Sequence, residues 1–218
     1  MIFQDRRDAG RVLARAVAKL HDLGDAIVLG LPRGGVPVAY EVALELNLPL
    51  DIFVVRKLGV PGQEELAMGA IASGGTVVMN RSVVQELGIS SEVIEAVSSR
   101  EELEIERRER VYRDGRAPAR VEGRTVILID DGLATGASMM AAGRALHSGA
   151  RQIIVAVPVA AESTCNEFRK EVDQIICAKT PQPFFAVGMF YRNFTQTTDE
   201  EVRSLLSQAR NRQGLQVA

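Results

Sequence analysis

Apolar residues recur along this chain in two patterns, one typical of helices and one typical of buried strands. Near the start their spacing predicts an amphipathic helix with one apolar face, made of Ala9, Val12, Leu13, Ala16, Val17 and Leu20. Asp5 or Asp8 is expected to cap this helix, and Gly24 to end the segment. A second stripe predicts another helix, with Val36, Ala39, Tyr40, Ala43 and Leu46 on its buried face.

Short apolar runs that lack alternation predict strands buried on both faces. They lie at residues 26–30, 50–55, 125–129, 152–157 and 172–177. Because these runs alternate with helical segments, the sequence predicts an α/β fold with a doubly wound parallel sheet. In such sheets ligands bind at the carboxyl ends of the strands, so the loops that follow the strands are the first places to look for chemistry.

Two stretches depart from this alternation. Residues 59–62 are expected to form a glycine-punctuated loop, and 70–72 with 76–79 a small hairpin. Residues 81–123 interrupt the α/β pattern, and residues 180–218 follow its last strand. We therefore expect one domain over residues 1–218, with a helical insertion at 81–123 and a small C-terminal hood at 180–218.

The insertion contains one long expected helix, Ser90 to Tyr112. Its second half is mostly charged, with acid-first pairs at i,i+4: Glu104–Arg108, Glu106–Arg110 and Glu109–Arg113. Since acids balance the arginines, an exposed helical insertion is favoured over a nucleic-acid-binding arm. A homodimer contact through the apolar start of this helix is left open.

The hood region carries much of the chain's sparse aromatic content. Thr198 with Glu201 three residues later forms a capping box that predicts a terminal helix. Aromatic residues before it could stack on a planar base or pack the loop onto the core, and the sequence supports both equally. The candidates for base binding are Pro181, Phe184 and Phe185.

Composition excludes several classes of protein. The formal net charge is −2, so no basic field indicates nucleic acid. No apolar run approaches membrane-spanning length and the start lacks a signal-peptide core, so a cytoplasmic protein without membrane contact is expected. Cys165 and Cys177 lack metal-site spacing and are expected to be reduced. His21 and His147 are expected to be solvated helix residues.

Residues 126–138, VILIDDGLATGAS, are the most informative segment. An apolar strand ends in two aspartates, and a turn of small residues then opens a helix. Bare N–H groups and the positive end of the helix dipole make such a turn an anion cradle. A phosphate repels carboxylates, so Asp130 and Asp131 must face something neutral or cationic beside it. A sugar diol or Mg²⁺ fits, which implies a ribose 5-phosphate ligand.

This segment resembles the phosphoribosyl-pyrophosphate (PRPP) signature of type I phosphoribosyltransferases. The resemblance implies that Asp130 and Asp131 hold the ribose hydroxyls and hold Mg²⁺, directly or through water. It also implies a 5-phosphate site at Ala134, Thr135, Gly136, Ala137 and Ser138. Other nucleotide motifs fit poorly: GxxxxGK[ST] is absent, and residues 30–35 lack GxGxxG spacing.

Two further loops are similar to pyrophosphate-binding loops of the same family. In residues 31–35, Arg33 precedes Gly34 and Gly35, and a guanidinium binds phosphate oxygens bidentately. The family often has a non-proline cis peptide there, and the candidate bond joins Pro32 to Arg33. In residues 54–62, Arg56 and Lys57 are expected to end a strand and to belong to a flexible loop that closes over the site.

The resemblance implies a Mg²⁺-dependent phosphoribosyltransferase that moves ribose 5-phosphate from PRPP to a nitrogen base and releases pyrophosphate. Asp130, Asp131, Arg33 and Lys57 are the expected catalytic residues. The insertion and hood do not match the well-known purine or pyrimidine salvage enzymes, so the heterocyclic acceptor stays open. Two alternatives remain: a PRPP- or nucleotide-sensing module without turnover, and a phosphosugar hydrolase that uses the same cradle.

Overall fold

The computed structural model describes residues 2–20 and 23–214. Five parallel strands form its central sheet, in the order β2-β1-β6-β7-β8. Their bounds are β1 Ala26–Gly30, β2 Leu50–Ile52, β6 Thr125–Ile129, β7 Gln152–Val159 and β8 Gln174–Lys179. The parallel sheet expected from the apolar runs is confirmed, with its last strand shifted two residues toward the C-terminus.

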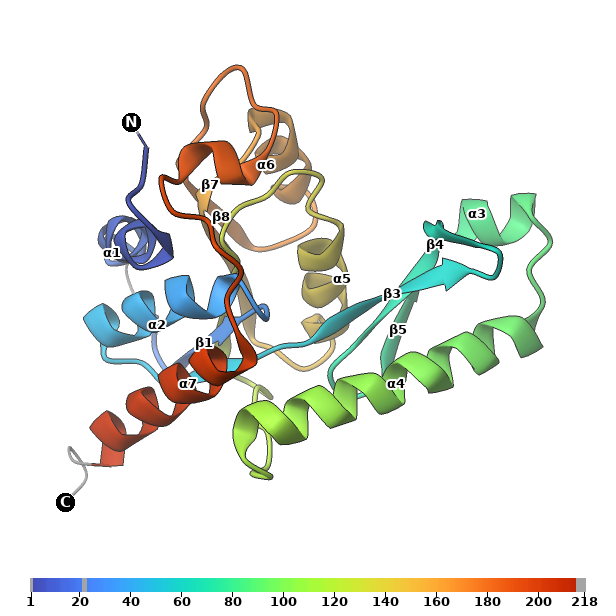
Figure 1. Cartoon of the computed structure of the whole chain (residues 1–218), viewed down its shortest axis with the longest axis horizontal. Helices are drawn as coiled ribbons and strands as arrows, with labels where there is room; N and C mark the ends of the chain where they lie inside the picture. Colours follow the sequence, from blue (N-terminus) through green and yellow to red (C-terminus); the bar gives the residue numbers. More distant parts are fainter. Residues whose placement is uncertain (1, 21–22, 215–218) are drawn as a thin grey trace.

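Helices cover both faces of this sheet (Figure 1), which confirms the doubly wound arrangement. On one face lie α1 (Arg6–Val17), α2 (Gly35–Leu46) and α7 (Asp199–Gly214). On the other lie α5 (Ala137–Leu146) and α6 (Glu162–Phe168). Successive side chains of β6 alternate between the two layers, Ile127 and Ile129 facing one and Val126 and Leu128 the other.

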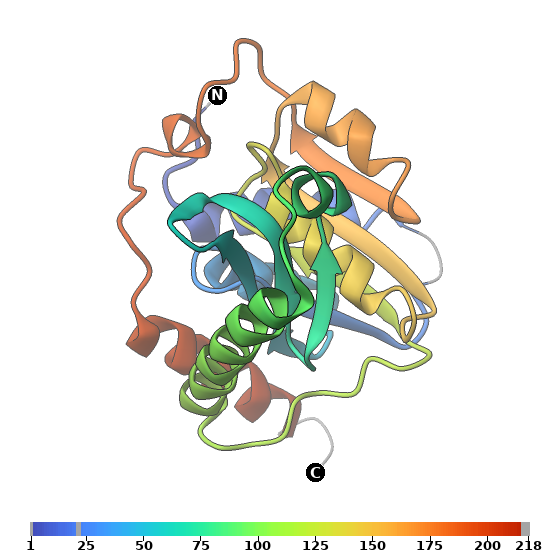
Figure 2. The same ribbon diagram turned by 90° about the vertical axis from the view of Figure 1, so that its right-hand side faces the viewer.

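A second unit projects from the core between β2 and β6. It consists of β3 (Val55–Val60), β4 (Gln63–Ala72), β5 (Thr76–Met79), α3 (Arg81–Glu86) and α4 (Ser91–Arg113), and we call residues 55–113 the arm. Its three strands are antiparallel, and Figure 1 shows them extending away from the core with α4 alongside, whereas Figure 2 looks along the arm toward the core. The predicted hairpin is confirmed between β4 and β5.

The arm corrects two predictions about residues 50–62. The strand expected at 50–55 ends at Ile52, and a new strand begins at Val55. The loop expected at 59–62 is largely strand, because Gly59 and Val60 pair with β4 and only Pro61 and Gly62 form the turn. Pairing with the neighbouring strand β4 outweighs the local glycine signal.

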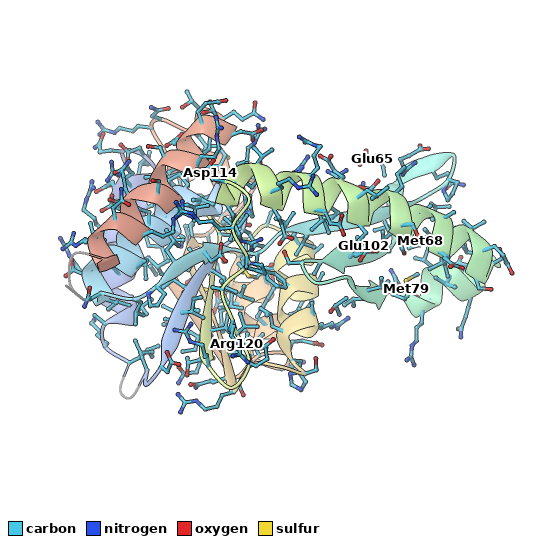
Figure 3. All side chains as sticks on the ribbon, turned by 90° about the horizontal axis from the view of Figure 1, so that it is seen from below. Glu65, Met68, Met79, Glu102, Asp114 and Arg120 are labelled. Carbon is cyan, nitrogen blue, oxygen red and sulfur yellow. A yellow bond between two sulfur atoms is a disulfide. The ribbon has the colours of Figure 1, made fainter. Side chains whose placement is uncertain are left out.

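Helix α4 is a single helix, as expected, and begins one residue later than predicted because Ser90 is its cap, but it is not simply exposed. Val97, Ile105 and Tyr112 are buried in the core cluster that includes β3, β4 and α7 residues. Of the three predicted pairs, Glu104–Arg108 and Glu109–Arg113 form, at 2.7 and 2.9 Å, whereas Glu106 and Arg110 form no ion pair with each other. Figure 3 shows Met68 and Met79 far out on the arm and Asp114 where α4 meets the core.

One buried ion pair anchors the arm to the sheet. Arg113, at the end of α4, donates from Nε to Asp51 Oδ1 at 2.9 Å and from Nη2 to the carbonyl of Ile52 at 3.0 Å. The two side chains are 5% and 10% exposed. Asp51 also accepts from the N–H of Ala119 at 2.8 Å, so one carboxylate joins β2, α4 and the segment that returns to β6.

The N-terminal segment and the hood meet beside the carboxyl edge of the sheet. Phe3 pairs with Tyr191 through an isolated parallel bridge, and their rings lie 5.4 Å apart. Asp5 caps α1, accepting from the N–H of Asp8 at 2.8 Å. The predicted cap of the terminal helix is also present, since Thr198 Oγ1 accepts from the N–H of Glu201 at 3.1 Å.

The two cysteines differ from expectation. Cys165 of α6 and Cys177 of β8 are joined as a disulfide, because α6 packs back against the strand that follows it. His147 is exposed at the C-terminal end of α5, whereas His21 lies outside the described residues. Over residues 2–20 and 23–214, no helix combines the length and the apolar character needed to cross a membrane.

Candidate functional site

The two aspartates of the predicted signature directly follow β6 at the carboxyl edge of the sheet. The N–H of Asp131 donates to Asp130 Oδ1 at 2.8 Å, so the two carboxyl groups are held side by side. Burial, followed by the negative charge of Asp131, raises the pKa of Asp130 well above its usual range. Burial also raises the pKa of Asp131, and Arg6 opposes that rise. Two buried acids this close together are stable in their charged forms only when hydrogen-bond donors or cations, from the protein or from a ligand, bind their oxygens.

The turn that follows has the form of an anion cradle. Gly136 adopts φ +71°, and α5 begins at Ala137 with no side chain capping it. Within the described chain, the N–H groups of residues 134–139 donate to no protein acceptor. The cradle is braced from α6, where Thr164 Oγ1 donates to the carbonyl of Ala134 at 2.7 Å and Phe168 fills the space beside Gly136. The residues predicted for the 5-phosphate therefore share one open helix start.

The glycine loop after β1 lies directly against the acids. A Cβ on Gly34 would overlap Asp131 Oδ2, and a Cβ on Gly35 would lie 2.6 Å from the carbonyl oxygen of Ile129 and 2.9 Å from Asp130 Cα. Only glycine permits this approach. The predicted cis peptide between Pro32 and Arg33 is present. The first loop and the signature, separated by about a hundred residues, thus meet at one point.

Arg33 of this loop contacts the start of the terminal helix. Its Nη1 lies 3.6 Å from Asp199 Oδ1, which also accepts from the hydroxyl of Tyr112 at 2.8 Å. Burial, followed by the hydrogen bond to Asp199, raises the pKa of Tyr112 to about 12, so the phenol is a hydrogen-bond donor at neutral pH. Asp199 therefore connects the glycine loop with the end of the arm.

The second predicted loop is placed differently. Arg56 and Lys57 lie inside β3, and Arg56 donates to Glu101 of α4 at 2.8 Å from Nε. Lys57 lies 3.1 Å from Glu65. The two side chains thus have partners within the arm. Lys57 nevertheless lines a groove of about 690 Å³ that Ala137 and Ser138 of the cradle also line, so Lys57 faces the α5 side of the arm.

The residues predicted to bind a base lie beyond α6. Pro181 and Phe184 line a pocket of about 420 Å³ together with Ala161 and Glu162, and Phe185 is 74% exposed. Phe184 also stacks on Phe190 at 5.2 Å and packs on the cluster around Phe3. The described residues that line this pocket include neither Asp130 nor Asp131. Packing onto the core therefore accounts for Phe184, and the base-binding role stays a prediction.

Two residues at the acid pair were not found from the sequence. Arg6 of α1 donates from Nε to Asp131 Oδ2 at 2.8 Å, and the hydroxyl of Tyr191 donates to the carbonyl of Asp131 at 2.5 Å. A signal for Arg6 was available: Arg6 and Arg7 stand in the first turn of α1, where the helix dipole disfavours cations, so each needs an acidic partner. Tyr191 left no comparable signal.

The donor set at this edge is compatible with Mg²⁺ held jointly with a substrate. No group of three or more His, Cys, Asp or Glu side chains suited to a metal occurs among residues 2–20 and 23–214. Asp130 and Asp131 supply hard carboxylate oxygens, which Mg²⁺ accepts in ones or twos when phosphate oxygens and water complete its shell. The residues therefore fit a magnesium ion that arrives with a phosphate ligand.

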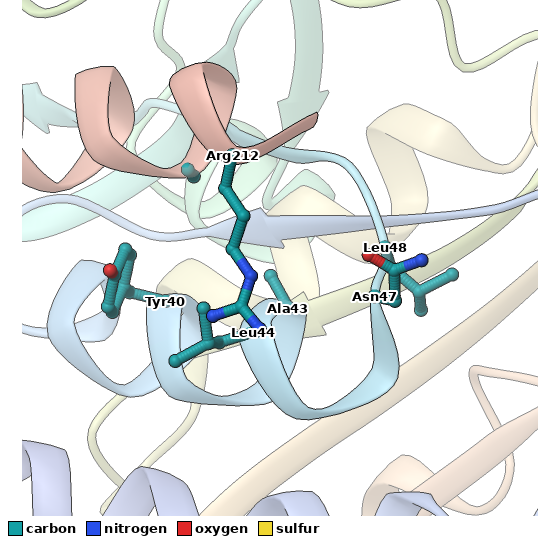
Figure 4. Close-up of a pocket in the computed structure, with 7 residues that line it drawn as sticks. Tyr40, Ala43, Leu44, Asn47, Leu48 and Arg212 are labelled. Atoms are coloured by element: carbon teal, nitrogen blue, oxygen red, sulfur yellow. The ribbon is translucent and has the colours of Figure 1, made fainter. Parts of the chain in front are cut away.

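Another pocket lies away from this edge. Tyr40, Ala43 and Leu44 of the C-terminal half of α2 line it, with Asn47 and Leu48 just after that helix and Arg212 of α7 (Figure 4). The opposite end of α2, at Gly35, touches the acids. This pocket therefore has no part in the site.

Comparison with known proteins identifies the class. The family model described as phosphoribosyl transferase domain matches residues 62–191. The chain belongs to the phosphoribosyl transferase family. The match includes the acids and the cradle, and it begins within the arm, after the glycine loop.

Two relatives are similar over nearly the whole chain. A Mycobacterium tuberculosis protein named "Putative phosphoribosyl transferase" is 46% identical over 209 residues, which are 95% of this chain and 47% of that protein. The chain thus spans about half the length of the curated relatives it matches. The crystal structure of a Thermus thermophilus protein, TT1426, is 41% identical with a TM-score of 0.83, covering 95% of this chain and 99% of the other.

Proposed function

We propose that this chain is a Mg²⁺-dependent phosphoribosyltransferase that moves ribose 5-phosphate from PRPP to a nitrogen heterocycle and releases pyrophosphate. One observation carries the proposal: the glycine loop touches the acid pair immediately before an open, uncapped helix start. Three binding elements for diphosphate, ribose and 5-phosphate thus follow one another along a single edge of the sheet.

Each element has a role that follows from its chemistry. The free N–H groups of residues 134–138 bind the 5-phosphate at the positive end of α5. Asp130 and Asp131 accept hydrogen bonds from the ribose hydroxyls. Arg33, with the backbone of Gly34 and Gly35, binds the diphosphate.

The reaction needs positioning and charge neutralisation more than a protein nucleophile. As the C1–diphosphate bond breaks, positive charge develops on the ribose ring and negative charge on the leaving group. Arg33 neutralises the leaving group, and the carboxylates of Asp130 and Asp131 lie beside the ring. Bound Mg²⁺ would supply additional positive charge to the diphosphate oxygens. Lys57, which lines the same groove as Ala137 and Ser138, would add to this charge by exchanging its exposed partner Glu65 for the diphosphate.

The test is release of pyrophosphate. Purified protein is mixed with PRPP, Mg²⁺ and a panel of purines, pyrimidines and other nitrogen heterocycles, and pyrophosphate is measured with a coupled assay. At least one acceptor should give release that is absent in the Asp130→Asn, Asp131→Asn variant and abolished by EDTA. No release across the panel, with PRPP left intact, contradicts transferase activity.

A sensing module without turnover is a second candidate, favoured by one feature. Asp131 and Arg33 already have protein partners, Arg6 and Asp199, so the edge is partly neutralised without a ligand. This candidate predicts that PRPP binds by calorimetry and no pyrophosphate appears. Breakdown of PRPP without an acceptor would instead favour a phosphosugar hydrolase.

A further inference from the structure

Arg6 is the one cation whose side chain contacts the acid pair directly among the described residues. It stands at the first position of α1, far from the signature in sequence, and its side chain is 12% exposed. Besides the bond from Nε to Asp131, its Nη1 donates to the carbonyl of Thr195 at 2.7 Å. Its guanidinium also lies 4.0 Å from the centre of the Phe194 ring. Three partners hold this side chain in one orientation.

The contact with Asp131 leaves the acid pair with a particular arrangement of free oxygens. Arg6 Nε donates to Asp131 Oδ2, and the N–H of Asp131 donates to Asp130 Oδ1. Within the described chain, Asp131 Oδ1 and Asp130 Oδ2 accept no hydrogen bond. One free oxygen therefore remains on each carboxylate. Two neighbouring hydroxyls on a sugar present two donors, one for each of these free oxygens.

Gly34 explains why Arg6 can reach this position. The Cβ that any other residue would place at Gly34 would overlap Asp131 Oδ2 and lie 3.2 Å from Arg6 Nε. The guanidinium therefore lies at the junction of the glycine loop and the acids, on the side of Asp131 Oδ2. By holding Oδ2 on the side of the loop, the guanidinium leaves Asp131 Oδ1 pointing away from the loop.

We propose that Arg6 is a positioning residue for the sugar site: by holding Asp131 Oδ2, it orients Asp131 so that Oδ1 accepts one hydroxyl of the ribose. This inference rests on the proposed function for the identity of the ligand. Arg6 acts through Asp131, and the phosphate-binding elements at residues 134–138 and 33–35 do not depend on it.

Two probes separate the sugar from the phosphates. Ribose 5-phosphate carries the hydroxyls, and inorganic pyrophosphate lacks them. With both measured by calorimetry in the presence of Mg²⁺, Arg6→Ala should weaken ribose 5-phosphate binding roughly 10- to 100-fold, as expected when a partner that orients a ligand-binding side chain is lost. Pyrophosphate affinity should stay within about twofold of the parent protein.

Three further variants exclude a general structural effect. Arg11→Ala removes an arginine from the same helix that is 52% exposed and pairs only with Asp8 and Glu41 among the described residues, and it should leave both affinities unchanged. Arg6→Lys keeps the charge without the planar fork, so it should recover part of the lost affinity. In an Asp131→Ala background, Arg6→Ala should weaken ribose 5-phosphate binding little further, because the two changes remove the same interaction.

Each outcome decides the inference. Equal weakening of pyrophosphate and ribose 5-phosphate would make Arg6 a phosphate ligand or a structural residue and would overturn the proposal, as would unchanged ribose 5-phosphate binding. Additive losses in the Asp131→Ala background would also overturn it. Selective weakening without any pyrophosphate release from PRPP would support the role of Arg6 while contradicting the transferase. Failure of the parent protein to bind ribose 5-phosphate would overturn both.

Discussion

The carboxyl edge of the core and the arm are built on different principles. At the edge, glycines permit close approach: Gly34 brings the loop after β1 against the Asp131 side chain, and Gly35 brings it against the backbone of Ile129 and Asp130. In the arm, charged side chains make the decisive contacts, with Arg113 on Asp51 and Arg56 on Glu101. Close backbone approach tolerates no added atom, whereas a side-chain ion pair requires that both partners be retained. The edge should therefore be sensitive to added volume, and the arm to lost charge.

The largest expected effect lies at the anchor of the arm. Arg113→Ala leaves Asp51 charged and buried with only N–H donors, and we expect the free energy of unfolding to fall by about 3–5 kcal/mol. Urea denaturation followed by circular dichroism measures this. As a control, Arg107→Ala removes an exposed arginine from the same helix, and it should lower the free energy of unfolding by less than about 1 kcal/mol. Equal losses in the two variants would show that the buried pair does not anchor the arm.

Substitution of the acid pair should lower activity more than stability. Asp130→Asn with Asp131→Asn removes two charge-assisted acceptors of the proposed sugar, each worth about 1.5–3 kcal/mol, so kcat/KM should fall about 10²- to 10⁴-fold. Removing the charges of two close acids relieves their repulsion and offsets the weaker pairing with Arg6, so the melting temperature should change little. A strong loss of stability would show that the acids serve the fold.

Added volume is tested at Gly35. Gly35→Ala places a methyl group 2.6 Å from the carbonyl oxygen of Ile129, which is backbone and cannot rotate away, so we expect a loss of about 1–3 kcal/mol and weaker pyrophosphate binding. Gly149→Ala is the matched control, because the nearest atom to its added Cβ is 4.0 Å away. If Gly35→Ala is as harmless as Gly149→Ala, the close approach of the two loops is wrong.

The smallest expected effect concerns the brace of the cradle. Thr164→Val preserves shape but removes the hydroxyl that donates to the carbonyl of Ala134, costing about 1 kcal/mol of stability. Ribose 5-phosphate should bind a few-fold more weakly, since the turn at Ala134 is held less firmly. Ser163→Ala, the exposed neighbour on α6, should change neither quantity. If Thr164→Val binds ribose 5-phosphate as tightly as the parent protein, the Thr164–Ala134 hydrogen bond does not contribute to phosphate binding.

Much of the core and its edge could be predicted from the sequence. The strands of the sheet, the helix stripes and the cap at Thr198 depend on local patterns that a few neighbouring residues express, and the structure confirms them. The cis peptide between Pro32 and Arg33 was predicted through resemblance. The arm was less predictable, because β3 pairs with β4 through residues whose composition resembles a loop, and pairing partners outside the local pattern decide such a strand.

The sequence by itself determined which chemistry this chain carries: two acids and an open helix start sit together in thirteen residues, so no fold is needed to join them. Tertiary structure alone decided which residues complete that chemistry. Arg6, Tyr191 and Asp199 reach the edge from segments far from the signature in sequence, and Arg56 is turned toward α4 instead. The reason is physical: a helix or strand pattern specifies which face of an element is buried, whereas the partner of a single charged side chain depends on how distant elements pack.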